Sequence, residues 1–315
     1  YRIFFMNRHI KKYYFYLLAR CLCLFGFYDR SLPYYSKVIQ FRTFFLDVQF
    51  QYMHAYEKSS KSCYLEIHGG IGDFLQHLPF MMKHPKESYV VVTHFSKAKE
   101  FFKALNISVN KIYYYENGEQ HRAIKNKLKK QTDSYVCPRE LFFKKEPFNQ
   151  TAHLQFKIKP VIGFHMSTSN QTGGQLDNKF ALKLIRTLLD QKMTVVLFGT
   201  QSELKTLHLG SHPNLIFASH KNIITNLAVV KYCDLLIGAE SAFKTMSSMS
   251  NIPTLVYHAD NNNHFRDRVF INPYIKAGVM TVYKYQALEK EIDQAIDFAL
   301  RIIYKLKLHV LGLKN

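Results

Sequence analysis

The sequence predicts an α/β protein with two parallel sheets, each built from strands that alternate with helices. From Ser62 onward, short apolar runs alternate with helix-length segments, and this alternation restarts after a polar break near position 150. The length of 315 residues also favours two domains over one. Two doubly wound halves would face each other across a cleft at the carboxyl ends of their strands, where such folds bind ligands.

The first sixty residues differ from the rest in composition. They contain nine Lys or Arg residues against three acids, with Phe and Tyr interleaved throughout. The most apolar stretch, Tyr13 to Tyr28, is too short to span a bilayer and carries Arg20. Two interpretations remain open: a basic, aromatic segment that lies on an anionic membrane surface, and helices that pack on the folded domain.

The elements expected after this segment fall in chain order. Strands are expected at 63–67, 88–93, 111–115 and 134–137, with helices at about 73–83, 97–105 and 119–130 between them. After a linker at 147–151, strands are expected at 161–165, 193–198, 215–217, 234–237 and 254–257, and helices at 179–190, 202–207, 223–231, 241–249 and 286–307. We therefore expect four parts: a helical segment 1–60, an N-terminal Rossmann-like domain 61–150, a C-terminal Rossmann-like domain 151–285, and an amphipathic helix in 286–315.

Charge and cysteine content narrow the functional classes. The formal net charge of +20 predicts an anionic partner, such as nucleic acid, a membrane surface or a phosphorylated substrate. The five cysteines form no CxxC pair, so neither a disulfide scaffold nor a structural zinc site is expected. The fifteen histidines show no HExxH or HxxxH spacing on a predicted helix, and we expect no metal.

A glycine-rich turn follows the first strand of the sheet. It reads His68-Gly69-Gly70-Ile71-Gly72-Asp73. Glycines here allow a tight turn and bring the backbone close to a ligand. The Asp73 carboxylate then has two readings: it caps the helix that follows, or it is a base exposed at the cleft.

This turn resembles the first βα turn of the heptosyltransferase-like enzymes, glycosyltransferase family 9. Their pattern Gly-x-Gly-Asp-x-Leu-x-x-Leu-Pro is matched by Gly70, Gly72, Asp73, Leu75, Leu78 and Pro79. The resemblance implies a GT-B fold, with an N-terminal acceptor domain and a C-terminal nucleotide-sugar domain. It also implies inverting transfer without metal or cofactor, with Asp73 as general base and with Gly69, Gly70, Gly72 and His68 in the acceptor-side loop.

The C-terminal half resembles the donor domain of the same family. The resemblance implies that donor phosphate or nucleotide is held by Ser167, Thr168, Ser169, Lys179, Gly199, Glu203, Ser241, Ala242 and Lys244, and donor sugar by Glu240. The central signature Asp-Thr-Gly-x-x-His is altered here, because Glu240, Ser241, Ala242 and Thr245 replace its four defined residues. ADP-heptose, the family's best-known donor, is therefore not assigned as the donor of this chain.

Several further side chains have a predicted position. His68 and His165 end the first strands of the two halves and are expected to face the cleft. His77 and His84 are expected on helix surfaces. Arg266 and Arg268 follow a strand of the second half, where they would contact an anion or form an exposed basic loop.

The sequence thus favours a glycosyltransferase that moves sugar from a nucleotide-sugar donor to an anionic glycolipid, oligosaccharide or surface glycan of the lipopolysaccharide-core type. Such a protein is expected in the cytoplasm, peripheral on the inner face of the cytoplasmic membrane. Two alternatives remain: a basic nucleic-acid-binding protein that stacks bases on its aromatic rings, and a catalytically inactive, sugar-binding GT-B relative. No RRM, KH or helix-turn-helix signature supports a nucleic-acid partner.

Overall fold

The computed structural model describes residues 8–40, 63–67, 70–83, 89–131, 135–136, 142–143, 156, 158–167, 176–218, 223–258, 272–285 and 289–310. The chain divides into two compact units, Tyr1–Glu140 and Leu141–Asn315. Phe142 and Phe143 belong to the second unit, where the Phe142 ring packs edge-on against Tyr274 and the Phe143 N–H donates to the carbonyl of Met249. The predicted linker at 147–151 lies outside the described residues.

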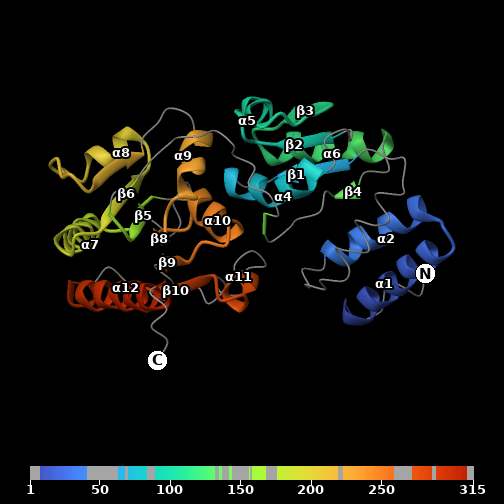
Figure 1. The fold of residues 1–315 in the computed structure, drawn as a ribbon. Helices are drawn as coiled ribbons and strands as arrows, with labels where there is room; N and C mark the ends of the chain where they lie inside the picture. The colour runs from blue at the N-terminus through green and yellow to red at the C-terminus, as the bar shows by residue number, and fades with distance from the viewer. Residues whose placement is uncertain are drawn as a thin grey trace. The chain divides into compact units, whose positions relative to one another are not determined.

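The first unit holds a helical hairpin and a parallel sheet (Figure 1). Within the described ranges, no helix combines the length and apolar character needed to cross a bilayer. The elements are α1 (Arg8–Leu24), α2 (Tyr28–Gln40), β1 (Cys63–Ile67), α4 (Ile71–Lys83), β2 (Tyr89–Thr93), α5 (Ala98–Ala104), β3 (Lys111–Tyr114), α6 (Gly118–Gln131) and β4 (Tyr135–Val136).

The four strands of this unit are parallel and lie in the order β3-β2-β1-β4. Strand order therefore reverses at β1, which is paired with β2 on one side and with β4 on the other. Helix α4 follows β1 and buries a wide face that includes Phe74, Leu78 and Met81. The prediction for His77 is wrong: it is 1% exposed, because it lies one helical turn after Phe74 on that same buried face.

The second unit is a six-stranded parallel sheet in the order β10-β9-β8-β5-β6-β7. This is the Rossmann order, with β5 as first strand and the reversal between β5 and β8. The elements are β5 (Val161–His165), α7 (Asn178–Asp190), β6 (Thr194–Phe198), α8 (Gln201–Lys205), β7 (Leu215–Ala218), α9 (Ile223–Val230), β8 (Leu235–Gly238), α10 (Ala242–Met249), β9 (Thr254–His258), α11 (Asn272–Lys276), β10 (Met280–Lys284) and α12 (Glu289–Val310).

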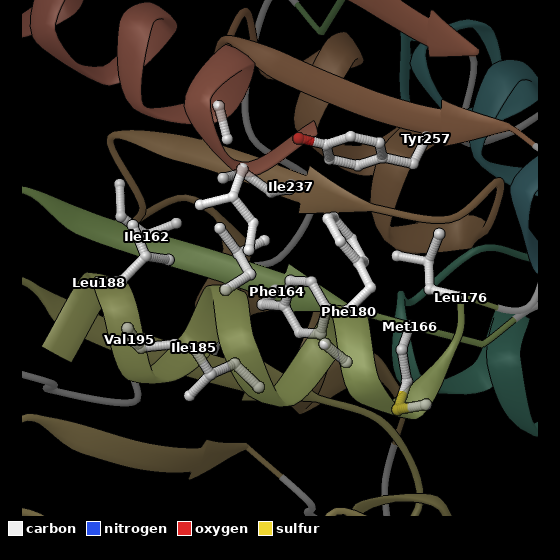
Figure 2. Packing of buried hydrophobic residues seen from close by; sticks show 14 of the residues in the cluster. Ile162, Phe164, Met166, Leu176, Phe180, Ile185, Leu188, Val195, Ile237 and Tyr257 are labelled. Atoms are coloured by element: carbon white, nitrogen blue, oxygen red, sulfur yellow. The ribbon is translucent and has the colours of Figure 1, made fainter. Parts of the chain in front are cut away.

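One face of this sheet carries the main hydrophobic core (Figure 2). Alternate strand residues such as Ile162 and Phe164 point to α7 and α12, whose apolar stripes cover them. The Phe180 ring of α7 packs at 4.8 Å from Tyr257, and the Tyr257 hydroxyl donates to the carbonyl of Ala295 in α12 at 2.6 Å. A polar tip with an internal acceptor lets a large ring be buried without losing its hydrogen bond.

The opposite face of the sheet packs against α10. The ring of Phe243 in α10 lies 4.9 Å from Phe198 and 4.7 Å from His165, which end β6 and β5. Both faces of β5 are thus covered, which explains its uninterrupted run of buried residues.

Candidate functional site

The C-terminal unit brings two chain segments together at its strand-order reversal. The N–H of Ala239, just after β8, donates to the carbonyl of His165 at the end of β5 at 2.9 Å. Gly238 makes this approach possible, because a Cβ at that position would overlap the His165 carbonyl. The loops after β5 and β8 therefore begin side by side, at the edge where doubly wound sheets bind ligands.

His165 is buried where these two loops begin, and one of its ring nitrogens has no hydrogen-bond partner among the described residues. Its side chain is 7% exposed, and the nitrogen in question is Nδ1. Burial lowers the pKa of His165 to about 4, and the nearby Glu203 carboxylate opposes that shift. The imidazole is therefore neutral near pH 7, able to donate one hydrogen bond and accept one.

The turn after β6 holds Glu203 in a fixed position. Thr200 caps α8: its hydroxyl accepts the N–H of Glu203 at 3.3 Å, and the Glu203 carboxylate accepts the N–H of Thr200 at 2.6 Å. Gly199 precedes this capping box with φ +148°, and a Cβ there would lie 3.0 Å from Glu203 Oε2. The glycine is thus needed both for its backbone conformation and for the space that the carboxylate occupies.

A pocket of about 250 Å³ opens beside this turn, lined by Met166, Ser167, Ser202, Glu203 and Thr206. Burial alone would raise the pKa of Glu203, but hydrogen bonds from Ser167 and Thr200 outweigh it and leave the pKa below its ordinary value. The pocket therefore presents a carboxylate anion, which only accepts hydrogen bonds, among hydroxyl groups that also donate. This combination suits a ligand with hydroxyl groups, such as a ribose.

Helix α10 begins shortly after β8, and the N–H groups of its first turn have no carbonyl acceptor within the helix. Ser241 is the N-cap, and its hydroxyl accepts the N–H of Lys244 at 3.4 Å. The N–H groups of Ala242 and Phe243 have no acceptor within the helix, which makes this end suited to an anion. Ser241 and Ala242 are half-buried.

The structure pairs Lys244 with Glu240. Lys244 Nζ lies 3.7 Å from Glu240 Oε1, and the lysine side chain is 7% exposed. A buried ammonium needs a nearby anion, which Glu240 supplies. Lys244 thus neutralises the carboxylate predicted to hold the sugar.

In the N-terminal unit, Asp73 lies in the first turn of α4. Its backbone N–H donates to the carbonyl of Gly70 at 3.0 Å, and its side chain is half-buried. Among the described residues, its carboxylate makes no hydrogen bond. If Asp73 stabilises the start of α4, it does so through the helix dipole alone. Its role as a general base stays a prediction.

The remaining predicted residues have varied positions. Lys179 is exposed in the first turn of α7 and does not line the pocket. Met166 and Leu176, which Figure 2 shows buried at the two ends of the loop after β5, are joined by a backbone hydrogen bond of 2.9 Å. The described part of the chain holds no cluster of His, Cys, Asp or Glu arranged for a metal ion. Predicted residues outside the described ranges are His68, Gly69, His84, Thr168, Ser169, Arg266 and Arg268.

Sequence reasoning missed three pocket residues: Met166, Ser202 and Thr206. Ser202 and Thr206 are four residues apart and flank Glu203, so their hydroxyl groups lie on one side of a helical turn. The four-residue spacing of Ser202 and Thr206 around Glu203 is the sequence feature that could have identified these two residues.

Comparison with known proteins supports the fold assignment. No protein-family model and no curated protein sequence matches the chain. ADP-heptose LPS heptosyltransferase II of E. coli aligns over 78% of this chain and 99% of its own, with a TM-score of 0.50 and 11% sequence identity. E. coli heptosyltransferase WaaC with ADP aligns over 77% and 99% (TM-score 0.48, 8% identity), and a family 9 glycosyl transferase of Veillonella parvula over 79% and 98% (TM-score 0.47, 13% identity). At this level of identity heptosyltransferase II shares the fold, and the predicted fold class is confirmed: the chain has the α/β fold of the GT-B type, with two parallel sheets.

Proposed function

We propose that this protein is a glycosyltransferase that uses a nucleotide-sugar donor. The observation that carries the proposal is the pocket around Glu203, at the carboxyl edge of the C-terminal sheet. Glu203 follows the second strand of a Rossmann-ordered sheet, where dinucleotide-binding folds place the carboxylate that accepts ribose hydroxyls. The likeness in fold to an ADP-heptose heptosyltransferase supports a donor of the same class.

In this proposal, different groups around the strand-order reversal bind the ribose, the diphosphate and the sugar of the donor. Glu203 would accept hydrogen bonds from the ribose hydroxyl groups, in a pocket sized for part of a nucleotide, and Ser167, whose hydroxyl donates to Glu203, would offer a further acceptor oxygen. The N-terminal N–H groups of α10, beside Ser241, would bind the diphosphate with the positive end of the helix dipole. Glu240, with its charge balanced by Lys244, would accept hydrogen bonds from the transferred sugar.

Transfer in this proposal is a single displacement that inverts the anomeric centre. The acceptor hydroxyl oxygen forms the new bond to the anomeric carbon while the bond from that carbon to the diphosphate oxygen breaks. Asp73 takes the hydroxyl proton, and the diphosphate leaves with the bonding electron pair. The N–H groups of α10 stabilise the leaving charge, which requires no metal.

The acceptor we propose is an anionic glycolipid or surface glycan, reached by a peripheral protein at the inner face of the cytoplasmic membrane. The net charge of +20 supports this assignment, because a basic surface attracts both a phosphorylated donor and an anionic acceptor.

Labelled nucleotide sugars, incubated with a phosphorylated glycolipid fraction, test the reaction. We expect label to enter the lipid, and Asp73→Asn to slow this by about a hundredfold or more while donor affinity is unchanged. Asp190→Asn, at the exposed end of α7, is the matched control and is expected to act as wild type. Near-normal transfer by a folded Asp73→Asn protein would show that Asp73 is not the general base and would leave it only a role at the start of α4.

The metal-free mechanism has its own test. Added EDTA is expected to leave the transfer rate unchanged, because in this proposal the N–H groups at the start of α10 stabilise the charge on the leaving diphosphate. A rate that falls with EDTA and returns with added Mg²⁺ or Mn²⁺ would overturn this part of the mechanism.

A further inference from the structure

Helices α1 and α2 form an antiparallel hairpin (Figure 1). Ala19 of α1 and Tyr35 and Val38 of α2 are fully buried, and the rings of Phe15 and Tyr34 stack at 6.2 Å across the pair. The inner face is thus an ordinary helix–helix core.

The outer face of α1 is also apolar. Tyr14, Leu17, Cys21 and Leu24 recur at the spacing of one helical face, and all four are exposed. The exposed fractions reach 61% at Leu17 and 79% at Leu24, where a surface helix ordinarily presents polar groups.

The apolar surface continues into the turn that joins the helices. Phe25 is 76% exposed and Phe27 is 49% exposed. Five of the nine large hydrophobic side chains exposed in the described part of the chain fall between Tyr14 and Phe27. We call Leu17 together with 24–27 the hairpin tip. Such a concentration marks an interaction surface.

The backbone turn of the hairpin tip is closed by internal hydrogen bonds. Gly26, with φ +77°, ends α1 in a Schellman motif: its N–H donates to Cys23 and the N–H of Phe27 donates to Leu22, at 3.0 and 2.8 Å. These two N–H groups need no water, so their hydrogen bonds are kept when the turn enters an apolar medium.

One cation lies at the hairpin tip, and the segment that carries the tip is basic. The Arg30 guanidinium lies 5.3 Å from the centre of the Phe27 ring. The first thirty residues contain six Lys or Arg residues and one acid, Asp29. Exposed aromatic and aliphatic side chains within a cationic segment fit the boundary between headgroups and acyl chains of an anionic bilayer.

We propose that the hairpin tip inserts into the surface of an anionic membrane, with Leu17, Leu24, Phe25 and Phe27 in the acyl boundary and Arg30 among the headgroups. A second copy of the chain fits less well, because pairing two tips would bring two cationic segments together. Nucleic acid also fits less well, since the aliphatic Leu17 and Leu24 offer no stacking surface to bases. The proposal does not depend on sugar transfer.

The chain contains no tryptophan, so one introduced indole reports on its own position. Phe25→Trp places it at the hairpin tip, and Phe217→Trp, at a 43% exposed phenylalanine of β7, is the matched control. With vesicles of phosphatidylcholine and phosphatidylglycerol, Phe25→Trp fluorescence is expected to shift to the blue and to be quenched by brominated acyl chains. Phe217→Trp emission is expected to stay unchanged.

A loss-of-binding variant completes the test. Leu24→Ser/Phe25→Ser removes exposed side chains only, and is expected to fold normally by circular dichroism yet bind the vesicles roughly tenfold or more weakly, the scale of one apolar side chain left in water. Phe217→Ser is expected to bind as wild type, and high salt to weaken wild-type binding only in part.

Three results would overturn the proposal. One is a Phe25→Trp spectrum that does not respond to anionic vesicles. The second is a blue shift that follows protein concentration without lipid, which would identify a contact between copies. The third is a response to single-stranded oligonucleotides in place of vesicles, which would identify nucleic acid.

Discussion

The Glu203 carboxylate has a local structural role and keeps capacity for a ligand. Oε2 accepts the N–H of Thr200 at 2.6 Å, and the Ser167 hydroxyl donates to the same carboxylate. An ionised carboxylate offers about four lone-pair sites, so acceptor sites remain after these bonds form. The hydroxyl of Thr200 completes the capping box around this carboxylate.

Because His165 is buried and neutral, we expect the free energy of unfolding to fall as the pH is lowered. Above its ordinary pKa of 6.5, neither the folded nor the unfolded chain protonates this side chain, and its contribution to stability is complete. As pH falls from 6.5 to about 4, the unfolded chain binds the proton and the folded chain does not, so about 3 kcal/mol of stability is lost. In urea denaturation at pH 7 and pH 4.5, His165→Asn is expected to lose much less stability between the two pH values than wild type does.

The matched control for this measurement is His208→Asn, because His208 is exposed in the turn after α8. That variant is expected to keep the wild-type acid sensitivity. If His165→Asn also keeps it, His165 is protonated in the folded protein at pH values well above 4.

At the scale of elements, the contact between β5 and β8 forms the edge of the candidate donor site. Gly238→Ala would push a methyl group into the His165 carbonyl and separate the two strands. We expect a loss of stability of about 3 kcal/mol or more, because backbone atoms of a central strand cannot yield as a flexible side chain does. Thermal or urea unfolding measures it.

Gly210→Ala is the control for that substitution, since a Cβ at Gly210 meets no atom within 4 Å. It is expected to unfold close to wild type. Equal stabilities for the two variants would mean that β5 and β8 do not approach each other as closely as described.

The central strands were readable from the sequence because both of their faces are buried. β5, β6, β8 and β9 appear as continuous apolar runs, and their predicted bounds agree with the structure to about one residue. The edge strand β10 was missed, since half-exposed residues of mixed character give it no such run. Its position is set by pairing with β9, a tertiary effect that local sequence does not contain.

The sequence predicted individual residues of the candidate site but not which of them contact each other. The motifs pointed to Ser167 and Glu203 separately, from segments more than thirty residues apart. Their hydrogen bond depends on the register of β5 against β6, in which Phe164 pairs with Leu197. The buried pairing of Lys244 with Glu240 likewise depends on where α10 packs, which the residue types alone do not determine.

At the scale of the whole molecule, each unit repeats one arrangement. In both sheets the strand order reverses at the first strand, and in both a loop with a candidate functional residue follows that strand. The N-terminal unit presents Asp73 there, and the C-terminal unit presents Ser167. The proposed base Asp73 and the proposed nucleotide pocket around Glu203 therefore belong to different units.

Calorimetric titration of the full chain with ADP, UDP, GDP and CMP tests the central claim, nucleotide binding by the C-terminal unit, most directly. We predict that one of these nucleotides binds, and that Glu203→Gln binds it roughly tenfold or more weakly, the scale of one charge-assisted hydrogen bond. Glutamine can still complete the capping box, so the turn after β6 keeps its structure, and Glu119→Gln on the exposed face of α6 is expected to bind as wild type. Binding of none of the four nucleotides, or equal affinity in Glu203→Gln and wild type, would contradict the account.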